Sequence, residues 1–192
     1  MESEKNLTSE ESLALITRMI SQAKRNFADG SFYFLLWGYV VLIAYLGNYV
    51  LFRLEYDAPF LVWLITLPAA VISGIHGYRR GKRSKVRTYT DQMYNQVWLS
   101  LLVPFITFIV FGFQLGYENL TGLILLLASS GVFMTGRLMK FKPAVFSSFF
   151  LSAGAILALV YNSEMQYLIG AVSIIFGYLV PGYMLRKLEK NG

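Results

Sequence analysis

Very few side chains in this sequence could carry out acid–base or metal chemistry. The chain contains one histidine, His76, and no cysteine. A transition-metal site of ordinary composition needs several His or Cys ligands, and a nucleophilic serine needs a nearby base. The sequence also lacks a G-x-S-x-G nucleophile elbow and a G-x-x-x-x-G-K-[ST] phosphate loop. We therefore predict no catalytic residue, no metal, no cofactor, and a protein that is not an enzyme.

His76 is the one ionisable side chain inside the long apolar segments defined below. With an ordinary pKa of about 6.5, an imidazole within a membrane could respond to pH or relay a proton. Its place between Gly74 and Gly77, near the end of its segment, favours instead a structural role, in which it bonds a neighbouring helix or lipid headgroups. Asn48 and Gln114 also lie near segment ends and receive the same interpretation.

Positive charge is concentrated in one run between two apolar segments. Its members are Arg79, Arg80, Lys82, Arg83, Lys85 and Arg87. Basic side chains beside a membrane helix gain about 1 kcal/mol each from anionic lipid headgroups. We therefore predict that this run binds anionic lipid or a cytoplasmic protein partner. Binding of lipid or of a protein partner explains the net charge of +6. We therefore do not expect nucleic acid as a partner.

Membrane helices must position these residues, because the composition excludes a water-soluble domain. Of the 192 residues, 56% are hydrophobic and only 15% are charged, whereas soluble domains have about 25% charged residues. The apolar runs are continuous and long enough for a helix to cross a hydrocarbon core of about 30 Å. The sequence predicts an all-α, multi-pass membrane bundle of six transmembrane helices, at 32–52, 58–78, 97–115, 120–136, 144–161 and 165–185.

The basic residues also predict how this bundle is oriented. All but Arg53 of the 17 basic residues fall on one side of a six-span arrangement. Because Lys and Arg accumulate on the cytoplasmic side of membrane proteins, we expect both termini in the cytoplasm. The predicted domains are a cytoplasmic N-terminal region at 1–31, the membrane domain at 32–185 and a basic cytoplasmic tail at 186–192.

Short outer loops predict that the six helices form three antiparallel hairpins. Membrane helices associate by close contact, so small residues four positions apart mark contact faces. The predicted contact pairs are Ala70 with Gly74, Ser73 with Gly77, Gly154 with Ala158, and Ser173 with Gly177. Prolines that can kink their helices are Pro68, Pro104 and Pro181. The tryptophans expected to anchor helix ends at the headgroups are Trp37, Trp63 and Trp98.

An amphipathic helix is predicted before the first span. Its apolar residues recur at helical spacing and are Leu13, Ile16, Met19, Ile20, Ala23 and Phe27. Thr8 and Glu11 have the spacing of a capping box at its start. Such a helix can lie on the membrane surface, bind a partner, or rest on the protein's own cytoplasmic loops, and the sequence favours none of these.

Two short stretches carry a resemblance to known proteins. Phe34-Leu35-Leu36-Trp37-Gly38-Tyr39 opens the first span, and Ser73-Gly74-Ile75-His76-Gly77-Tyr78-Arg79-Arg80 closes the second. With the N-terminal amphipathic helix, this layout resembles small six-helix proteins of bacterial inner membranes that have no assigned activity. The resemblance covers nearly the whole chain and implies a location in the bacterial inner membrane, but it offers no functional motif to carry over.

Two functional hypotheses follow from the sequence. The first is a non-enzymatic membrane component whose basic cytoplasmic face engages anionic lipid or a protein partner. The second is a small channel or uncoupled facilitator for a neutral solute, with a path lined by serines and threonines, either within one chain or in a homo-oligomer. A void at the bilayer midplane, where polar side chains of the second, fourth and fifth spans converge, would favour the second hypothesis.

Overall fold

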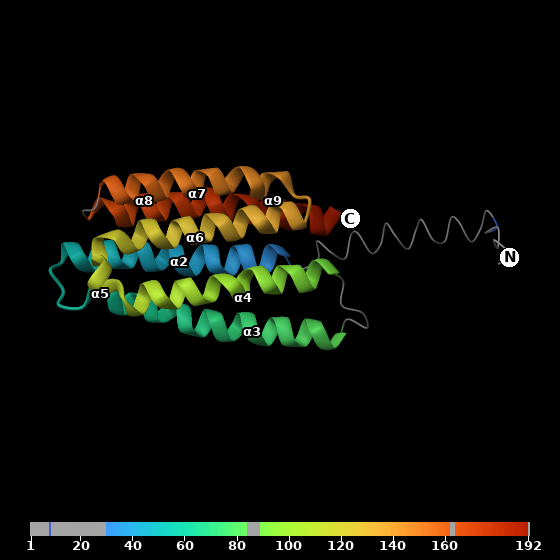
Figure 1. Cartoon of the computed structure of the whole chain (residues 1–192), viewed down its shortest axis with the longest axis horizontal. Helices are drawn as coiled ribbons and strands as arrows, with labels where there is room; N and C mark the ends of the chain where they lie inside the picture. Colours follow the sequence, from blue (N-terminus) through green and yellow to red (C-terminus); the bar gives the residue numbers. More distant parts are fainter. Residues whose placement is uncertain (1–7, 9–29, 84–88, 162–163, 192) are drawn as a thin grey trace.

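The computed structural model describes residues 8, 30–83, 89–161 and 164–191, and this part of the chain is helical without any strand (Figure 1). The elements are α2 (Gly30–Arg53), the 3-10 helix η1 (Pro59–Ile65), α3 (Thr66–Arg83), α4 (Tyr89–Val110), α5 (Gly112–Leu115), α6 (Tyr117–Leu138), α7 (Lys142–Val160), α8 (Met165–Ile174), the π-helical segment η2 (Ile175–Leu179) and α9 (Val180–Asn191). The predicted amphipathic helix before α2 lies outside the described residues.

Six of these helical stretches are long and apolar enough to cross a membrane, which confirms the predicted helical membrane bundle. They run over Gly30–Arg53, Pro59–Lys82, Gln92–Val110, Asn119–Leu138, Lys142–Val160 and Met165–Asn191. The second span combines η1 with α3, and the sixth combines α8, η2 and α9. Residues 186–191, predicted as part of a tail, belong to the last turns of α9.

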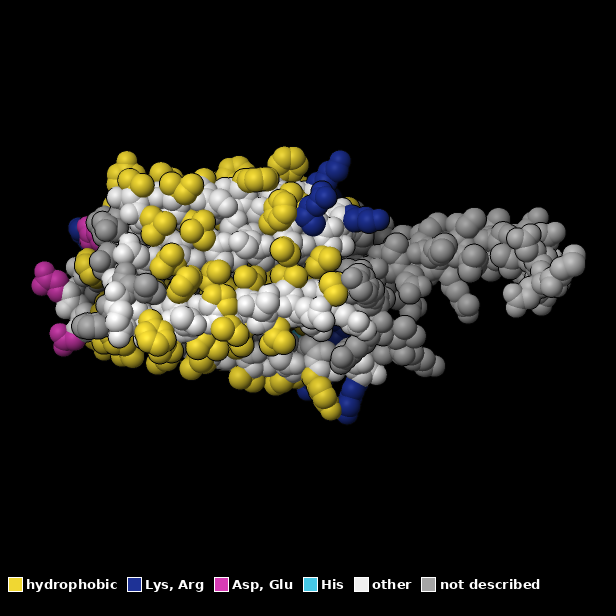
Figure 2. Space-filling model, in the orientation of Figure 1, with side chains coloured by type: hydrophobic (Ala, Val, Ile, Leu, Met, Phe, Trp, Pro, Cys, Tyr) yellow, Lys and Arg dark blue, Asp and Glu magenta, His cyan; other side chains and the backbone are white. Residues whose placement is uncertain are grey.

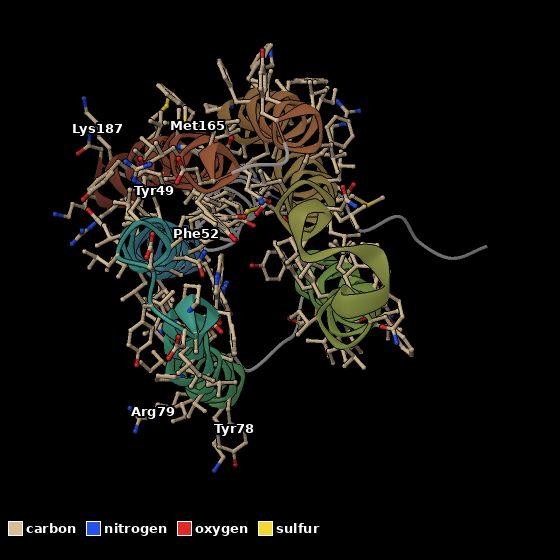
Figure 3. All side chains as sticks on the ribbon, turned by 90° about the vertical axis from the view of Figure 1, so that its left-hand side faces the viewer. Tyr49, Phe52, Tyr78, Arg79, Met165 and Lys187 are labelled. Atoms are coloured by element: carbon tan, nitrogen blue, oxygen red, sulfur yellow. The ribbon has the colours of Figure 1, made fainter. Side chains whose placement is uncertain are left out.

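The six spans form an arc in which each helix packs on its neighbours. The first span, α2, packs against the last, α8–η2–α9; α7 packs on α8 and, most extensively, on α6. Helices α3 and α4 occupy the two ends of the arc, with α3 on α2 and α4 on α6. Figure 3 looks along the helices and shows these two ends apart from one another. Each predicted hairpin pair is in contact, and the three hairpins stand side by side, with the hairpin of α7 and the last span between the other two.

Small residues allow a close approach between α7 and the last span. Gly154 lies directly against the Ser173 side chain, and Gly177 lies against Leu151, so neither glycine has room for a Cβ. This confirms the contact faces predicted from two of the small-residue pairs. The buried side chains of the core are Phe34, Tyr45, Leu125, Ala128, Val132, Phe141, Ala144, Leu151, Ala155, Ala158, Ala171, Ile174, Tyr178 and Leu185.

The contact face predicted from Ala70 and Gly74 is wrong. A Cβ added to Gly74 would meet no atom within 4 Å, and Ala70 is exposed. The reason is that α3 turns a different face, which includes Ala69 and Ser73, toward α2. Small residues permit close helix contact, but they do not require it where no helix lies opposite.

The third span ends earlier than predicted. Helix α4 stops at Val110, the chain turns at Phe111, and the short α5 leads into α6 at Tyr117. Gly112 lies against Leu120 of α6, where a Cβ would be 2.8 Å from a Leu120 methyl group, so the glycine permits this early fold-back. Helix α6 consequently spans Tyr117–Leu138 and is not the short span that the sequence suggested.

Helix irregularities in the second and sixth spans lie beside prolines. Pro181 cannot donate a backbone hydrogen bond to the carbonyl one turn earlier, and the helix widens into the π-helical η2 just before it. Pro68 follows the change from 3-10 to α geometry between η1 and α3. Helix α4, by contrast, continues through Pro104.

Candidate functional site

Basic side chains of several helices gather at one end of the bundle. The exposed members are Arg79 and Lys82 of α3, Arg137, Lys140 and Lys142 around the turn from α6 to α7, and Arg186, Lys187 and Lys190 of α9. We call this end of the molecule the basic end. Figure 2 shows these dark blue side chains around one end and the magenta carboxylates at the other, with an apolar surface between them.

The basic run predicted from the sequence is only partly described. Arg79, Arg80 and Lys82 lie on the last turns of α3, with Arg80 half-buried. The Lys82 ammonium lies 5.0 Å from the centre of the exposed Tyr78 ring, in a cation–π arrangement. Arg83 ends α3, although its side chain is not described, and Lys85 and Arg87 lie outside the described residues.

One carboxylate, Glu189, lies at the basic end but is engaged by the first helix. The Ser31 backbone N–H donates to Glu189 Oε1 at 3.0 Å, and the Ser31 hydroxyl donates to Oε2. A negative charge is favourable at the N-terminus of a helix, where amides have no partner within the helix. Glu189 therefore joins the end of α9 to the start of α2.

His76 belongs to an aromatic cluster near the basic end. Its ring stacks on Phe32, with centroids 4.0 Å apart and planes 18° apart, and meets the Tyr33 ring edge-on at 5.7 Å. Tyr33 in turn lies 6.2 Å from Tyr94 of α4. The half-buried imidazole therefore links α3 to α2 by ring packing.

The opposite end of the bundle, which we call the acidic end because it carries Glu55, Asp57 and Glu164, has an open pocket of about 740 Å³. Its lining residues are Phe52, Arg53, Glu55, Tyr56, Asp57, Pro59 and Glu164. Arg53 and Glu164 form an ion pair across it at 2.9 Å, with side chains 60% and 30% exposed. Exposed ion pairs of this kind contribute at most about 1 kcal/mol. Gln114, predicted as a polar candidate, is exposed on α5 and does not line this pocket.

Several polar side chains in the membrane region bond between helices. Ser129 of α6 donates to the Ser148 carbonyl of α7 at 2.8 Å, and its hydroxyl lies 2.7 Å from that of Ser152. The serines of the fourth and fifth spans therefore bond across the α6–α7 contact.

Two tryptophans donate their indole N–H to a side chain of a neighbouring helix. Trp37 donates to Ser73 of α3 at 3.1 Å, and Trp98 donates to Thr135 of α6 at 3.2 Å. Both were expected mainly as headgroup anchors. Their bonds also attach the peripheral helices α3 and α4 to the rest of the bundle.

A second polar group lies deeper, in the half of the bundle nearer the acidic end. It consists of Tyr45 and Asn48 of α2, Thr121 of α6 and Gln166 of α8, all buried, and we call it the outer polar cluster. In the described part of the chain, neither the Tyr45 hydroxyl nor Gln166 Oε1 has a hydrogen-bond partner. Leaving a buried polar atom unpaired costs about 1–3 kcal/mol, so this feature calls for a physical explanation.

Sequence reasoning identified only Asn48 of this cluster. Tyr45 resembles an ordinary apolar-span residue, and Gln166 an ordinary residue of a helix end, until the contacts of α2 with α8 are known. The sequence offered one signal for Gln166. It lies one turn before Gly170, and residues four apart share a helix face. In the structure that face makes a close contact at Gly170.

Comparison with known proteins gives no match to a family model, a curated protein or a solved structure. The fold itself defines the class: six apolar helices of membrane-spanning length make this chain a multi-pass membrane protein.

Proposed function

We propose that this multi-pass membrane protein is a non-enzymatic component of the cell membrane whose basic end binds anionic lipid headgroups on the cytoplasmic side. The observation that carries the proposal is the separation of charge between the ends of the bundle (Figure 2). Arg53 is the only basic side chain that the described residues place at the acidic end, and it is paired with Glu164.

The orientation follows from the same separation. Positive side chains next to membrane helices stay in the cytoplasm during insertion. Since α2 begins and α9 ends at the basic end, the proposal places both ends of the membrane domain in the cytoplasm. By the resemblance noted in the sequence, the membrane is the inner membrane of a bacterium.

Lipid is favoured over a protein partner by where the charges lie. The exposed basic side chains that the structure describes are spread over α3, the α6–α7 turn and α9. Exposed apolar side chains accompany them on the same helices: Tyr78 on α3, Phe146 on α7, and Tyr183 and Leu188 on α9. Acyl chains beside the apolar groups and headgroups beside the charges would satisfy both features at once.

The hypothesis of a channel or facilitator for a neutral solute has less support. It expects polar side chains of α3, α6 and α7 to converge on a void. Ser129 instead bonds the Ser148 carbonyl and the Ser152 hydroxyl across the α6–α7 contact, and α3 packs on α2. A homo-oligomer that uses the exposed faces of α3 and α4 stays a separate hypothesis.

Thermal unfolding in detergent with added lipid tests the proposal. We expect dioleoyl phosphatidylglycerol to raise the Tm of the full chain more than phosphatidylcholine does, because a ligand of the folded state stabilises it. A variant with Arg79→Gln, Arg80→Gln and Lys82→Gln should lose part of the difference, because the basic side chains of the α6–α7 turn and of α9 remain, and added salt should weaken the whole difference. The control Arg53→Gln, at the other end, should keep it. Equal effects of both lipids on the unsubstituted chain would contradict the proposal and leave a protein partner as the explanation of the charge.

A further inference from the structure

The packing of α2 against α8 brings Tyr45 and Gln166 to the same part of the interface. The Tyr45 ring lies against Gly170, where a Cβ would be 2.7 Å from the ring. Nearer the acidic end, Phe52 faces Tyr167 with ring centroids 6.2 Å apart. Gln166 shares a helix face with Gly170 and lies one turn closer to the acidic end. It is therefore on the side of α8 that faces α2, just beyond the level of Tyr45.

The Tyr45 side chain is held in place by its neighbours. Trp63 of η1 meets its ring edge-on, with centroids 4.9 Å apart and an interplanar angle of 88°. Thr121 of α6 lies near the Tyr45 hydroxyl, but the two groups do not meet in hydrogen-bond geometry. The hydroxyl is thus fixed among α2, α6 and α8, with polar side chains nearby and no hydrogen-bond partner in the described part of the chain.

The Tyr45 and Gln166 side chains are both buried, so an unpaired polar atom on either of them is costly. Tyr45 is 1% exposed and Gln166 is 4% exposed, and within the described residues both the Tyr45 hydroxyl and Gln166 Oε1 lack a partner. Other buried hydroxyls of the bundle, those of Ser129, Ser148 and Ser173, do have partners. Buried polar atoms in proteins are nearly always paired, and an enclosed small molecule supplies the partner where the chain does not.

We propose that the outer polar cluster binds one small neutral molecule that carries hydrogen-bond donors. Gln166 Oε1 accepts a hydrogen bond from it, the Tyr45 hydroxyl bonds it, and Thr121 lies close enough to contribute a third polar group. The ligand is neutral because the four residues of the cluster include no charged side chain, and an ion in the membrane interior needs a partner of opposite charge. Water is the smallest molecule of this chemistry, and a small amide shares it. This site is independent of lipid binding at the basic end.

The sign of a stability change tests whether the site is occupied. Tyr45→Phe removes the hydroxyl and keeps the ring. If the hydroxyl bonds a ligand, the substitution should lower the Tm in detergent, by about 2–4 °C for a chain of this size. Tyr161→Phe, which removes an exposed hydroxyl at the end of α7, is the matched control and should leave the Tm unchanged. An unchanged or raised Tm for Tyr45→Phe would overturn the proposal, because removing a truly unpaired buried hydroxyl does not destabilise.

A double substitution tests whether the two residues share one ligand. Gln166→Leu alone should also lower the Tm. The variant with both Tyr45→Phe and Gln166→Leu should lose less than the two single losses together, because each single change already weakens the hold on the same molecule. Fully additive losses would overturn the shared site.

Added propionamide, a small neutral amide, identifies the class of occupant. If the site takes such solutes, propionamide should raise the Tm of the unsubstituted chain relative to the double variant. An equal response of the two proteins, together with the destabilisation by Tyr45→Phe, assigns the site to water. In both cases the Tyr45→Phe result decides whether the site exists.

Discussion

Ser31 and Glu189 are 158 positions apart in the sequence, yet the Glu189 carboxylate accepts hydrogen bonds from both the backbone N–H and the hydroxyl of Ser31. The contact joins the first turn of the first span to the last turns of the last span. About two turns further into the bundle, the hydroxyls of Tyr39 and Tyr183 also bond to each other. The two ends of the membrane domain are therefore tied together at the basic end.

Glu189→Ala should lower the free energy of unfolding by about 1–2 kcal/mol, because it removes a charged acceptor from the N-terminus of α2. Chemical or thermal unfolding in detergent measures the change. The neighbouring Lys190→Ala is the control and should have little effect, since the Lys190 side chain is exposed. Equal effects of the two substitutions would show that the Ser31 contact contributes nothing.

Gly154→Ala and Gly74→Ala should change stability in opposite directions. A Cβ at Gly154 would overlap the Ser173 side chain, whereas a Cβ at Gly74 would meet no atom within 4 Å. We expect a loss of about 1–3 kcal/mol for the first and a gain of up to about 1 kcal/mol for the second, because alanine favours the helix. If Gly154→Ala proves as stable as the unsubstituted chain, the close contact of α7 with α8 is wrong.

Ser129→Ala should destabilise the bundle by about 1 kcal/mol, because Ser129 bonds across the α6–α7 contact. Ser130→Ala is the matched control, since Ser130 bonds only back to the Leu126 carbonyl of its own helix. The difference between the two variants in an unfolding titration measures the interhelical bond. No difference would mean that the bond adds nothing to the α6–α7 contact.

Lys140→Gly should raise the free energy of unfolding by about 0.5–1 kcal/mol. Lys140 has a φ of 53° just after α6, where the Phe141 N–H bonds the Gly136 carbonyl and the Lys140 N–H bonds the Arg137 carbonyl. This is the hydrogen-bond pattern of a Schellman motif, whose left-handed residue is ordinarily glycine. Lys140→Ala removes the same charge and keeps the backbone strain, so it should bring no gain. A gain from both substitutions would attribute the effect to charge.

The number and type of the spans could be predicted because a bilayer demands long continuous apolar helices. The separation of basic from acidic residues was visible for the same reason, since charges must stay at the ends of such helices. The close approach at Gly154 and Gly177 was also predictable, because two small residues one turn apart form a surface that a neighbouring helix can contact.

The features that could not be predicted from the sequence depend on which helix packs against a given helix face. Gly74 carries the same small-residue pattern as Gly154, but no neighbour faces it. Tyr45 and Gln166 became candidates only once their burial and their missing partners were known. The early end of α4 at Val110 depends on the contact of Gly112 with Leu120, which local hydropathy does not encode.

The orientation of the basic end is most directly measured by labelling single introduced cysteines, since the chain has none of its own. Glu55→Cys marks the acidic end and Lys190→Cys marks the basic end, and each variant is treated with a membrane-impermeant maleimide on intact spheroplasts. We expect label at position 55 without lysis and label at position 190 only after the membrane is opened. Label at position 190 on intact spheroplasts, with position 55 protected, would place the basic end outside and contradict the proposed role at the cytoplasmic surface.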